Sequence, residues 1–331
     1  MKLAFFVSSI GTEKPEYTTT RLARAAVKLG HEVFYVAAGG FCHGPEDAMG
    51  TVARPAPSDA SLDLEDFCDQ MQEAEPVYLD MTELGAVMLR NDPSEDIEDR
   101  PWAVDVGIVF GQLAMSHGVT VVNDPLWLSK AANKLYMEEF PSEVRPKTLV
   151  ARDIDAIKRF VEGLNGKAVL KPLLGAKGQS VFFVQGPDDP NLNQIIDTIR
   201  SDGYVVAQEF LEGAEDGDVR FFMLNGEPLR SNGSFAAFRR RPAEGDLRSN
   251  ISAGGKSEAV DIGEDELKVA RTIGPKLAAD GMFLAGLDIV GDKLVEVNVQ
   301  SPGGLGSIEA FTGIDFAPIV IEALVKRAEA V

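Results

Sequence analysis

Apolar runs alternate with amphipathic stretches through the first part of the chain. Residues 2–7 (KLAFFV) predict a strand, and residues 18–29 predict a helix that ends at Gly30. Residues 32–36 (EVFYV) predict a second strand. A strand, a helix and a strand in this order are typical of a βαβ unit, so we expect an open α/β domain at the N-terminus.

The remainder of the first third is less regular. Residues 43–75 are acidic and rich in proline and glycine, and they predict one weak helix at most. Residues 85–89 and 119–122 predict strands, and residues 102–117 predict a helix stopped by Gly118. No G-x-G-x-x-G follows the first strand, so a dinucleotide-binding function has little support.

A different mixture of elements begins after residue 122. Helical and strand-like patterns follow one another, and Asn225-Gly226 predicts a tight hairpin turn. We therefore expect an N-terminal domain over residues 1–122 and a second domain over 123–331. The expected helices are 125–140, 153–164, 192–200, 264–279 and 316–328, and the expected strands include 168–171, 181–184 and 204–209.

The segment GLDIVGDKLVEVNV (286–299) predicts two apolar strands around a turn, yet it contains two carboxylates and an amide. Buried polar groups cost free energy unless they have partners. Glu296 and Asn298 are two residues apart and therefore share one face of their strand. A shared partner for Glu296 and Asn298 would offset the cost of burying both side chains on this face.

The position of Asp288 depends on the length of this turn. A two-residue turn at 291–292 places Asp288 on the face opposite Glu296, whereas a three-residue loop at 291–293 places it directly across from Glu296. The second register groups three oxygen ligands, with no cationic side chain among them, and oxygen ligands suit Mg²⁺. A solvated sheet face is the alternative.

Two lysines are candidates for binding phosphate. In AVLKPLLGAKGQSV, Lys171 ends a predicted strand and is followed by Gly175 and Gly178. Glycines allow backbone amides to approach phosphate oxygens, and a lysine supplies positive charge. The segment is not a Walker A motif, because no G-K-[ST] opens a helix. Lys134, in ANKLYMEEF, is the second candidate. An ordinary glycine-rich turn and a surface lysine are the alternatives.

The segment VVAQEFLEGAEDGDVRFF (205–222) predicts a strand, a connector and a second strand. A connector between two lobes can hydrogen-bond an adenine through its backbone, and Glu209 and Leu211 lie at that point. Asp218 and Arg220 alternate in the second strand and therefore face the same way.

Composition narrows the class of protein. A length of 331 residues suggests about two domains, and the net charge of −20 argues against a nucleic-acid partner. Cys42 and Cys68 are too few for a disulfide framework, which favours a reducing, cytoplasmic location. The apolar run at the N-terminus is too short to span a membrane. The only histidines are His31, His43 and His117, which excludes a serine-hydrolase triad confined to the C-terminal two-thirds.

In their order, these motifs resemble those of the ATP-grasp ligases, and more specifically those of the bacterial glutathione synthetases. The order is K-P-x-x-G-x-x-G, Q-E-x-L, D-G-D-x-R and L-D-I-x-G-D-x-L-x-E-x-N-V-x-S-P. The resemblance implies an ATP-grasp fold whose two lobes clasp ATP, with a small lobe over about 143–205 and a polar substrate loop over about 231–258. Further matches are RNDP (90–93), TVVNDP (120–125), NKL (133–135), Thr148, DPNL (189–192), NGEP (225–228), RSNISAGG (248–255) and IGPKL (273–277).

The resemblance also implies a role for each candidate residue. Those implied to bind ATP are Lys134, Lys171, Gly175, Gly178, Glu209, Leu211 and Asp218. Those implied to hold two Mg²⁺ ions, for which Mn²⁺ could substitute, are Asp288, Glu296 and Asn298. Those implied to lie beside an acyl phosphate and its acceptor are Arg220, Arg248 and Asn250.

The implied reaction joins γ-glutamylcysteine to glycine through an acyl phosphate and needs no protein nucleophile. The resemblance further implies small-molecule substrates and a homo-oligomer. A ligase for another acid or amine is one alternative, and an ATP-binding regulatory module is another. The complete set Asp288, Glu296, Asn298 and Arg220 argues against the regulatory module.

Four segments depart from the family pattern. The family carries Asp-Pro after its first strand and Lys-Asp before a Ser/Thr pair, where this chain has VSSI (7–10) and EYTT (16–19). Asn91 replaces a lysine, Ser249 replaces a glycine, and the glycine-rich run 303–306 replaces a threonine and a polar run. These positions face the substrates, so we expect either a changed acid or amine, or drift within the family.

Overall fold

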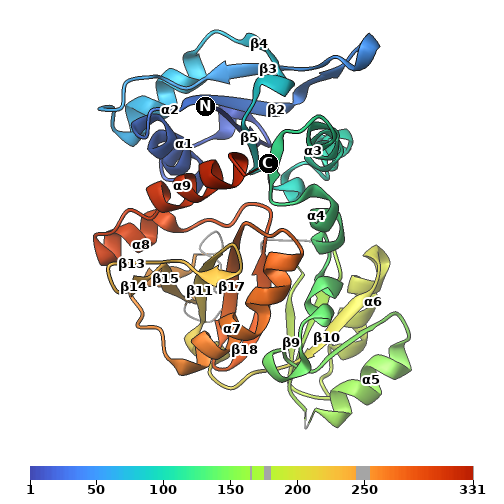
Figure 1. The fold of residues 1–331 in the computed structure, drawn as a ribbon. Helices are drawn as coiled ribbons and strands as arrows, with labels where there is room; N and C mark the ends of the chain where they lie inside the picture. Colours follow the sequence, from blue (N-terminus) through green and yellow to red (C-terminus); the bar gives the residue numbers. More distant parts are fainter. Residues whose placement is uncertain (165, 175–179, 244–253, 331) are drawn as a thin grey trace.

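The computed structural model describes residues 1–164, 166–174, 180–243 and 254–330, and its elements form three main sheets (Figure 1). The first sheet has the strand order β4-β3-β2-β1-β5-β6. The central strands β2, β1, β5 and β6 pair in parallel, which confirms the expected open α/β arrangement. The bounds are β1 (Lys2–Val7), β2 (Glu32–His43), β3 (Met49–Pro55), β4 (Val77–Asp80), β5 (Ala86–Leu89) and β6 (Thr120–Val122).

Successive residues of β1 contribute to two different hydrophobic clusters. Leu3 and Phe5 pack in the cluster that includes helices α1 (Thr18–Lys28) and α9 (Ala317–Ala328). Phe6 packs in the other cluster, with residues of α3 (Val106–Ser116). The last helix of the chain therefore covers the first sheet, where it lies beside α1 (Figure 1).

The acidic segment 43–75 is more regular than expected. Instead of one weak helix it forms β3 and the helix α2 (Leu64–Glu73), and β4 follows. Met49, Gly50, Thr51 and Ala53 of β3 are buried, but the glycine and proline within MGTVARP hide the strand from a hydrophobicity pattern. Asp63 caps α2 by accepting hydrogen bonds from two backbone amides of its first turn.

The second sheet is antiparallel, with the order β7-β10-β8-β9, and forms a lobe with its own core. Helices α5 (Ile154–Gly163) and α6 (Leu192–Asp202) contribute the apolar side chains that pack on it. The bounds are β7 (Thr148–Ala151), β8 (Ala168–Pro172), β9 (Phe182–Val184) and β10 (Val205–Glu209), close to the expected ranges.

The third sheet has the order β16-β15-β11-β17-β18, with β12 also paired to β11. Helix α7 (Glu264–Ala279) packs against it through Val269, Ile273 and Leu277. The expected Asn225-Gly226 turn is present, since both residues have positive φ angles of 52° and 79°. The bounds are β11 (Asp218–Leu224), β12 (Glu227–Pro228), β15 (Ala237–Arg241), β16 (Lys256–Glu258), β17 (Leu284–Val290) and β18 (Lys293–Asn298).

The substrate loop expected at 231–258 contains regular structure. Besides β15 and β16, the short strands β13 (Arg230–Ser231) and β14 (Ser234–Phe235) pair with each other. The helix expected over 125–140 is also divided, into α4 (Pro125–Ala131) and a 3₁₀ helix (Lys134–Glu139). Helix α8 (Leu305–Thr312), which was not expected, begins within the glycine-rich run 303–306.

Asn123 joins the end of the first sheet to the third. Its amide oxygen accepts a hydrogen bond from the Leu284 backbone amide, and its amide nitrogen donates to the Leu284 carbonyl, both over 2.9 Å. The domain boundary at residue 122 stays a prediction, because α9 returns to the first sheet. Within the described ranges, no helix combines the length and the apolar character needed to cross a membrane.

Candidate active site

The hairpin β17–β18 brings Asp288 opposite Glu296, and Gly286 opposite Asn298. The expected facing of the two carboxylates is therefore confirmed, although the loop is the two-residue alternative and not the three-residue one. Val290 pairs with Lys293, which leaves a two-residue turn. The register shifts between Asp288 and Ile289, so that one residue of β18 is left without a partner on β17. A β-bulge of this kind restores the register that the short turn alone would have reversed.

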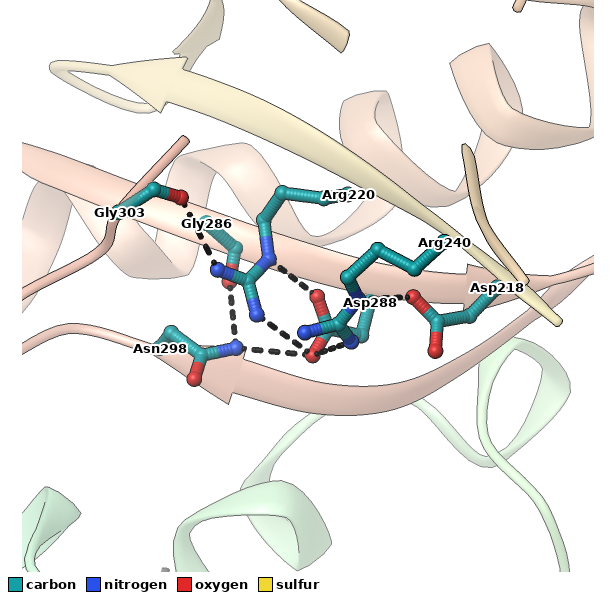
Figure 2. A network of polar contacts seen from close by, with 7 residues as sticks. All are labelled: Asp218, Arg220, Arg240, Gly286, Asp288, Asn298 and Gly303. Atoms are coloured by element: carbon teal, nitrogen blue, oxygen red, sulfur yellow. Dashed lines mark hydrogen bonds and ion pairs between the residues drawn. The ribbon is translucent and has the colours of Figure 1, made fainter. Parts of the chain in front are cut away.

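Asp288 lies at the centre of a buried network with two arginines (Figure 2). Arg220 on β11 is directly across from it, with Nε 2.5 Å from Oδ1 and Nη2 3.0 Å from Oδ2. Arg240 on β15 places Nη2 2.6 Å from Oδ2 of Asp288 and donates from Nε to Asp218 over 2.8 Å. Two arginines from neighbouring strands therefore join this face, which the hairpin sequence alone did not indicate.

Asp288 stays ionised because its charge is paired. Asp288 is only 1% exposed, and burial alone would raise its pKa. The positive charges of Arg220 and Arg240 outweigh burial and hold the pKa of Asp288 at about 2. Arg220, Arg240, Asp218 and Asp288 thus form two positive and two negative charges that balance each other.

Glu296 differs from Asp288. Its side chain is still reached by solvent, but protein atoms surround it enough that desolvation raises its pKa, and the charge of Asp288 raises it further. Lys171 opposes both effects. A carboxylate held next to another carboxylate is stabilised by any cation that binds between them.

Lys171 and Lys134 approach Glu296 from two other elements. Lys171, on β8, donates from Nζ to Gln208 on β10 over 3.1 Å, and the Gln208 amide nitrogen lies 3.1 Å from the Thr148 hydroxyl. Burial lowers the pKa of Lys171. Burial, and then the charge of Lys171, lower the pKa of Lys134 to about 8. Two such neighbouring ammonium groups are suited to an anionic ligand.

A cavity lies between the 3₁₀ helix that begins at Lys134 and strand β18. Asn133 positions this lysine, because its side chain accepts a hydrogen bond from the Leu135 amide over 2.9 Å and so starts a new turn. The residues that carry chemistry in the cavity wall are Asp92, Lys134, Glu296, Asn298 and Ser301. The arrangement combines cations for phosphate with oxygen ligands for a divalent metal.

The donor set fits Mg²⁺ in chemistry, with one condition. Two carboxylates and one amide supply only oxygen ligands, and phosphates and water can complete the coordination of a hard cation. No group of three or more His, Cys, Asp or Glu side chains forms a metal site within the described ranges. Both oxygens of Asp288 are bonded to arginines, and Asn298 donates to its Oδ2 over 3.1 Å. Asp288 can bind a metal only if these donors move.

Glu209 and Leu211 lie where β10 leaves the second sheet. The carboxylate of Glu209 accepts a hydrogen bond from the Lys147 amide over 2.8 Å, so this side chain fastens the strand end. The Leu211 carbonyl accepts from the Ala214 amide over 3.2 Å. Their expected role beside an adenine stays a prediction. The expected site residues Gly175, Gly178, Arg248 and Asn250 lie outside the described residues.

Arg240 and Gln208 are members of the site that sequence reasoning missed. The signal for Arg240 is the alternation in AFRRR (237–241), where Phe238 and Arg240 are both buried and the neighbouring arginines are more exposed. The signal for Gln208 is a polar residue at the end of the apolar run VVAQ. Asp218, implied to bind ATP, is the partner of Arg240, and its role in ATP binding stays a prediction.

The glycine-rich departure at 303–306 touches the network directly. The Gly303 carbonyl accepts a hydrogen bond from Arg220 Nη1 over 3.3 Å (Figure 2). The backbone amides of Gly304 and Leu305 lie 3.1 Å and 3.3 Å from the Thr18 hydroxyl. This segment therefore connects the arginine network with the first domain.

Comparisons with known proteins agree on one family. The family model "Prokaryotic glutathione synthetase, N-terminal domain" matches residues 1–129, and "Prokaryotic glutathione synthetase, ATP-grasp domain" matches residues 133–313. The chain is 37% identical to a glutathione synthetase of Shewanella oneidensis, over 75% of this chain and 75% of that protein. It is 31% identical to a glutathione synthetase of a Synechocystis species, over 99% of this chain and 100% of that protein.

Two solved structures show the same fold. D-cycloserine synthetase DcsG has a TM-score of 0.66 at 15% identity, covering 98% of this chain and 99% of that one. The ATP-grasp ligase PsnB, in complex with minimal precursor, Mg and ADP, has a TM-score of 0.60 at 18% identity, covering 98% of both chains. Both likenesses support the ATP-grasp fold alone.

Proposed function

The chain belongs to the prokaryotic glutathione synthetase family of ATP-dependent carbon–nitrogen ligases, and from this we propose that it joins γ-glutamylcysteine to glycine. Enzymes with this fold use ATP and Mg²⁺. The observation that carries the proposal is the convergence of Lys134 and Lys171 on Glu296, beside the Arg220–Asp288 pair.

The proposed reaction has two steps. The γ-phosphoryl group of ATP moves to the cysteinyl carboxylate of γ-glutamylcysteine, which gives an acyl phosphate and ADP. The amine of glycine then attacks the carbonyl carbon, phosphate leaves, the amide bond forms and the amine loses a proton. Lys134 and Lys171 bind and orient the phosphates, and Gly175 and Gly178 supply backbone amides.

Asp288, Glu296 and Asn298 hold the metal in this proposal, as two Mg²⁺ ions or as Mn²⁺. When bound, the metal offsets the negative charge on the phosphate oxygens. Phosphate oxygens also compete with Asp288 for Arg220 and Arg240, so phosphate binding and the release of Asp288 favour each other. In this proposal Arg220 acts on the transferred group, and Arg248 and Asn250 are given the same role by the family resemblance alone.

Glu209 and Leu211 bracket the adenine in this proposal, at the connector between the two lobes. Asp218 accepts a hydrogen bond from Arg240 and so positions this guanidinium on the phosphate-binding face of the third sheet. A protein that acts in the cytoplasm as a homo-oligomer is a further part of the proposal, supported by the family resemblance. Light scattering of the purified protein tests the oligomer.

Phosphate release from Mg-ATP tests the function. We expect release only when γ-glutamylcysteine and glycine are both present, together with an amide product of the mass of glutathione. Release that needs neither substrate, or ATP binding without release, would contradict the proposal. Phosphate release that requires another acid or amine would support the ligase activity and show that the proposed substrates are wrong.

A further inference from the structure

A second cavity is lined by Ser301, Gly303 and Gly304 and by residues that follow strands of the first sheet, among them Ser8 and Arg90. Its volume is about 240 Å³, far more than the ~10–15 Å³ that one water molecule needs. It shares Asp92 and Ser301 with the cavity that contains Lys134 and Glu296. Gly303, whose carbonyl accepts from Arg220, also lies in its wall. A ligand can therefore extend from the arginine network into this cavity.

Arg90 is the only arginine or lysine among the described residues of the cavity wall, and one of its donors is unused. The residue is 4% exposed, and it donates from Nε to Thr19 over 3.2 Å and from Nη2 to the Pro302 carbonyl over 3.0 Å. Its Nη1 is buried without a hydrogen-bond partner among the described residues. A buried donor left unpaired costs free energy, so a ligand acceptor would be favoured there.

Glu13 supplies the opposite charge in the same wall. Its Oε2 is buried and has no hydrogen-bond partner among the described residues. Burial raises the pKa of Glu13 to about 7, and the charge of Arg90 opposes this rise. The two side chains affect each other electrostatically without forming an ion pair in the described structure, so each still needs a partner of its own.

The remaining charges of the wall indicate what kind of ligand fits. Glu16, Asp92 and Glu95 join Glu13, so four carboxylates face one guanidinium. A ligand that carried only carboxylates would be repelled here, whereas an ammonium group beside a carboxylate would match both orphaned atoms. Glu13 lies outside the positions where this chain departs from the family's Asp-Pro and Lys-Asp pairs.

We propose that Arg90 and Glu13 bind the α-amino-acid head group of the acid substrate, Arg90 through its carboxylate and Glu13 through its ammonium group. This inference rests on the proposed function and deepens it by assigning the end of the substrate that does not react. The cysteinyl carboxylate lies at the arginine network, and the γ-glutamyl head extends past Ser301 into the second cavity.

Two substrate analogues separate the two contacts. Glutarylcysteine lacks the ammonium group, and 4-aminobutanoylcysteine lacks the head carboxylate. With the wild-type enzyme we expect each change to lower kcat/KM by about 10–100-fold, the size of one charge-assisted hydrogen bond. The Glu13→Gln variant should lose a similar factor with γ-glutamylcysteine and little with glutarylcysteine. Glu98→Gln, an exposed change of equal charge outside this wall, should keep the wild-type preference.

Calorimetric binding of γ-glutamylcysteine without ATP separates this inference from the proposed function. Binding that weakens in Glu13→Gln, with no turnover in any variant, would support the head-group site and contradict the ligase activity proposed. Turnover with an unchanged preference in Glu13→Gln would overturn the site and leave the ligase. Equal use of glutarylcysteine by the wild-type enzyme would also overturn it.

Discussion

Arg220 and Asp288 face each other edge to edge across paired strands, with Nε–Oδ1 and Nη2–Oδ2 distances of 2.5 Å and 3.0 Å. Arg240 contacts the same carboxylate from the next strand but one, through Nη2 at 2.6 Å from Oδ2. A carboxylate so occupied cannot bind a metal until the arginines turn to another anion. The pair therefore couples metal binding to phosphate binding.

Asp288→Asn should destabilise the protein and stop turnover. The change leaves two buried arginines with one fewer negative partner, and breaking a buried ion pair by removing one member costs about 3–5 kcal/mol. Urea unfolding without nucleotide measures this loss, and phosphate release measures activity. Asp292→Asn, in the turn of the same hairpin, is the control and should change stability by less than about 0.5 kcal/mol. A fully stable Asp288→Asn protein would contradict the role given to the network.

Glu296→Gln should separate stability from activity. Desolvation and the charge of Asp288 raise the pKa of Glu296, so its ionised form is disfavoured in the folded protein. The wild type therefore loses stability as pH rises above the ordinary glutamate range, and the glutamine variant does not. We expect the melting temperature of the variant to exceed that of the wild type more at pH 8 than at pH 5, while phosphate release falls sharply. A variant that melts below the wild type at pH 8 would show that Glu296 stabilises the free enzyme.

The sequence predicted that Asp288 and Glu296 face each other, but it did not predict the β-bulge that brings them into this register. Alternation fixes the shared face of Glu296 and Asn298, since side chains on a strand repeat every two residues. The bulge after Asp288 depends on how the whole hairpin packs, and no local residue pattern indicated it. The helices α1, α7 and α9 were predicted to within a few residues because their apolar periodicity is strong.

The elements that were missed share a physical cause. Strand β3 contains a glycine and a proline, and β15 contains three consecutive arginines, so both resemble loops in sequence. Arg240 was missed with its strand, because an arginine in a polar segment is usually exposed. Its burial is explained only by pairing with Asp218 and Asp288, which lie far from it in sequence.

The pKa of Lys134, about 8, predicts an alkaline limit for nucleotide binding. Above this value the free enzyme loses the positive charge that attracts phosphate, so the affinity for Mg-ATP should weaken as pH rises from 8 to 9. Lys134→Arg keeps its charge and should move this limit upward. Calorimetry of Mg-ATP binding at pH 7, 8 and 9 measures the effect. Lys130→Arg, on the neighbouring helix, should follow the wild-type profile, and an identical profile for Lys134→Arg would contradict the assignment.

Glu13 predicts a pH-dependent stability that its ligand should remove. Its pKa is about 7 in the folded protein instead of 4.5, mainly because of burial, while Arg90 lowers it and Glu95 raises it. Tyr35 and Cys68, from β2 and α2, are the other titratable groups that feel its charge.

The fold therefore favours protonated Glu13. Stability is fully present below pH 4.5, falls as pH rises towards 7, and is constant above that value, with a total loss of at most ~3 kcal/mol. Glu13→Gln lacks this loss, so its free energy of unfolding should match the wild type near pH 4.5 and exceed it at pH 7.5.

Saturating γ-glutamylcysteine should close the gap, because its ammonium group pairs with ionised Glu13 in the wild type only. Denaturant unfolding of both proteins at both pH values, with and without the dipeptide, measures this gap under all four conditions. The difference in free energy of unfolding between the two proteins could instead be the same at both pH values. The pKa of Glu13 would then not be raised in the folded protein, and its side chain would be less buried than the structure indicates.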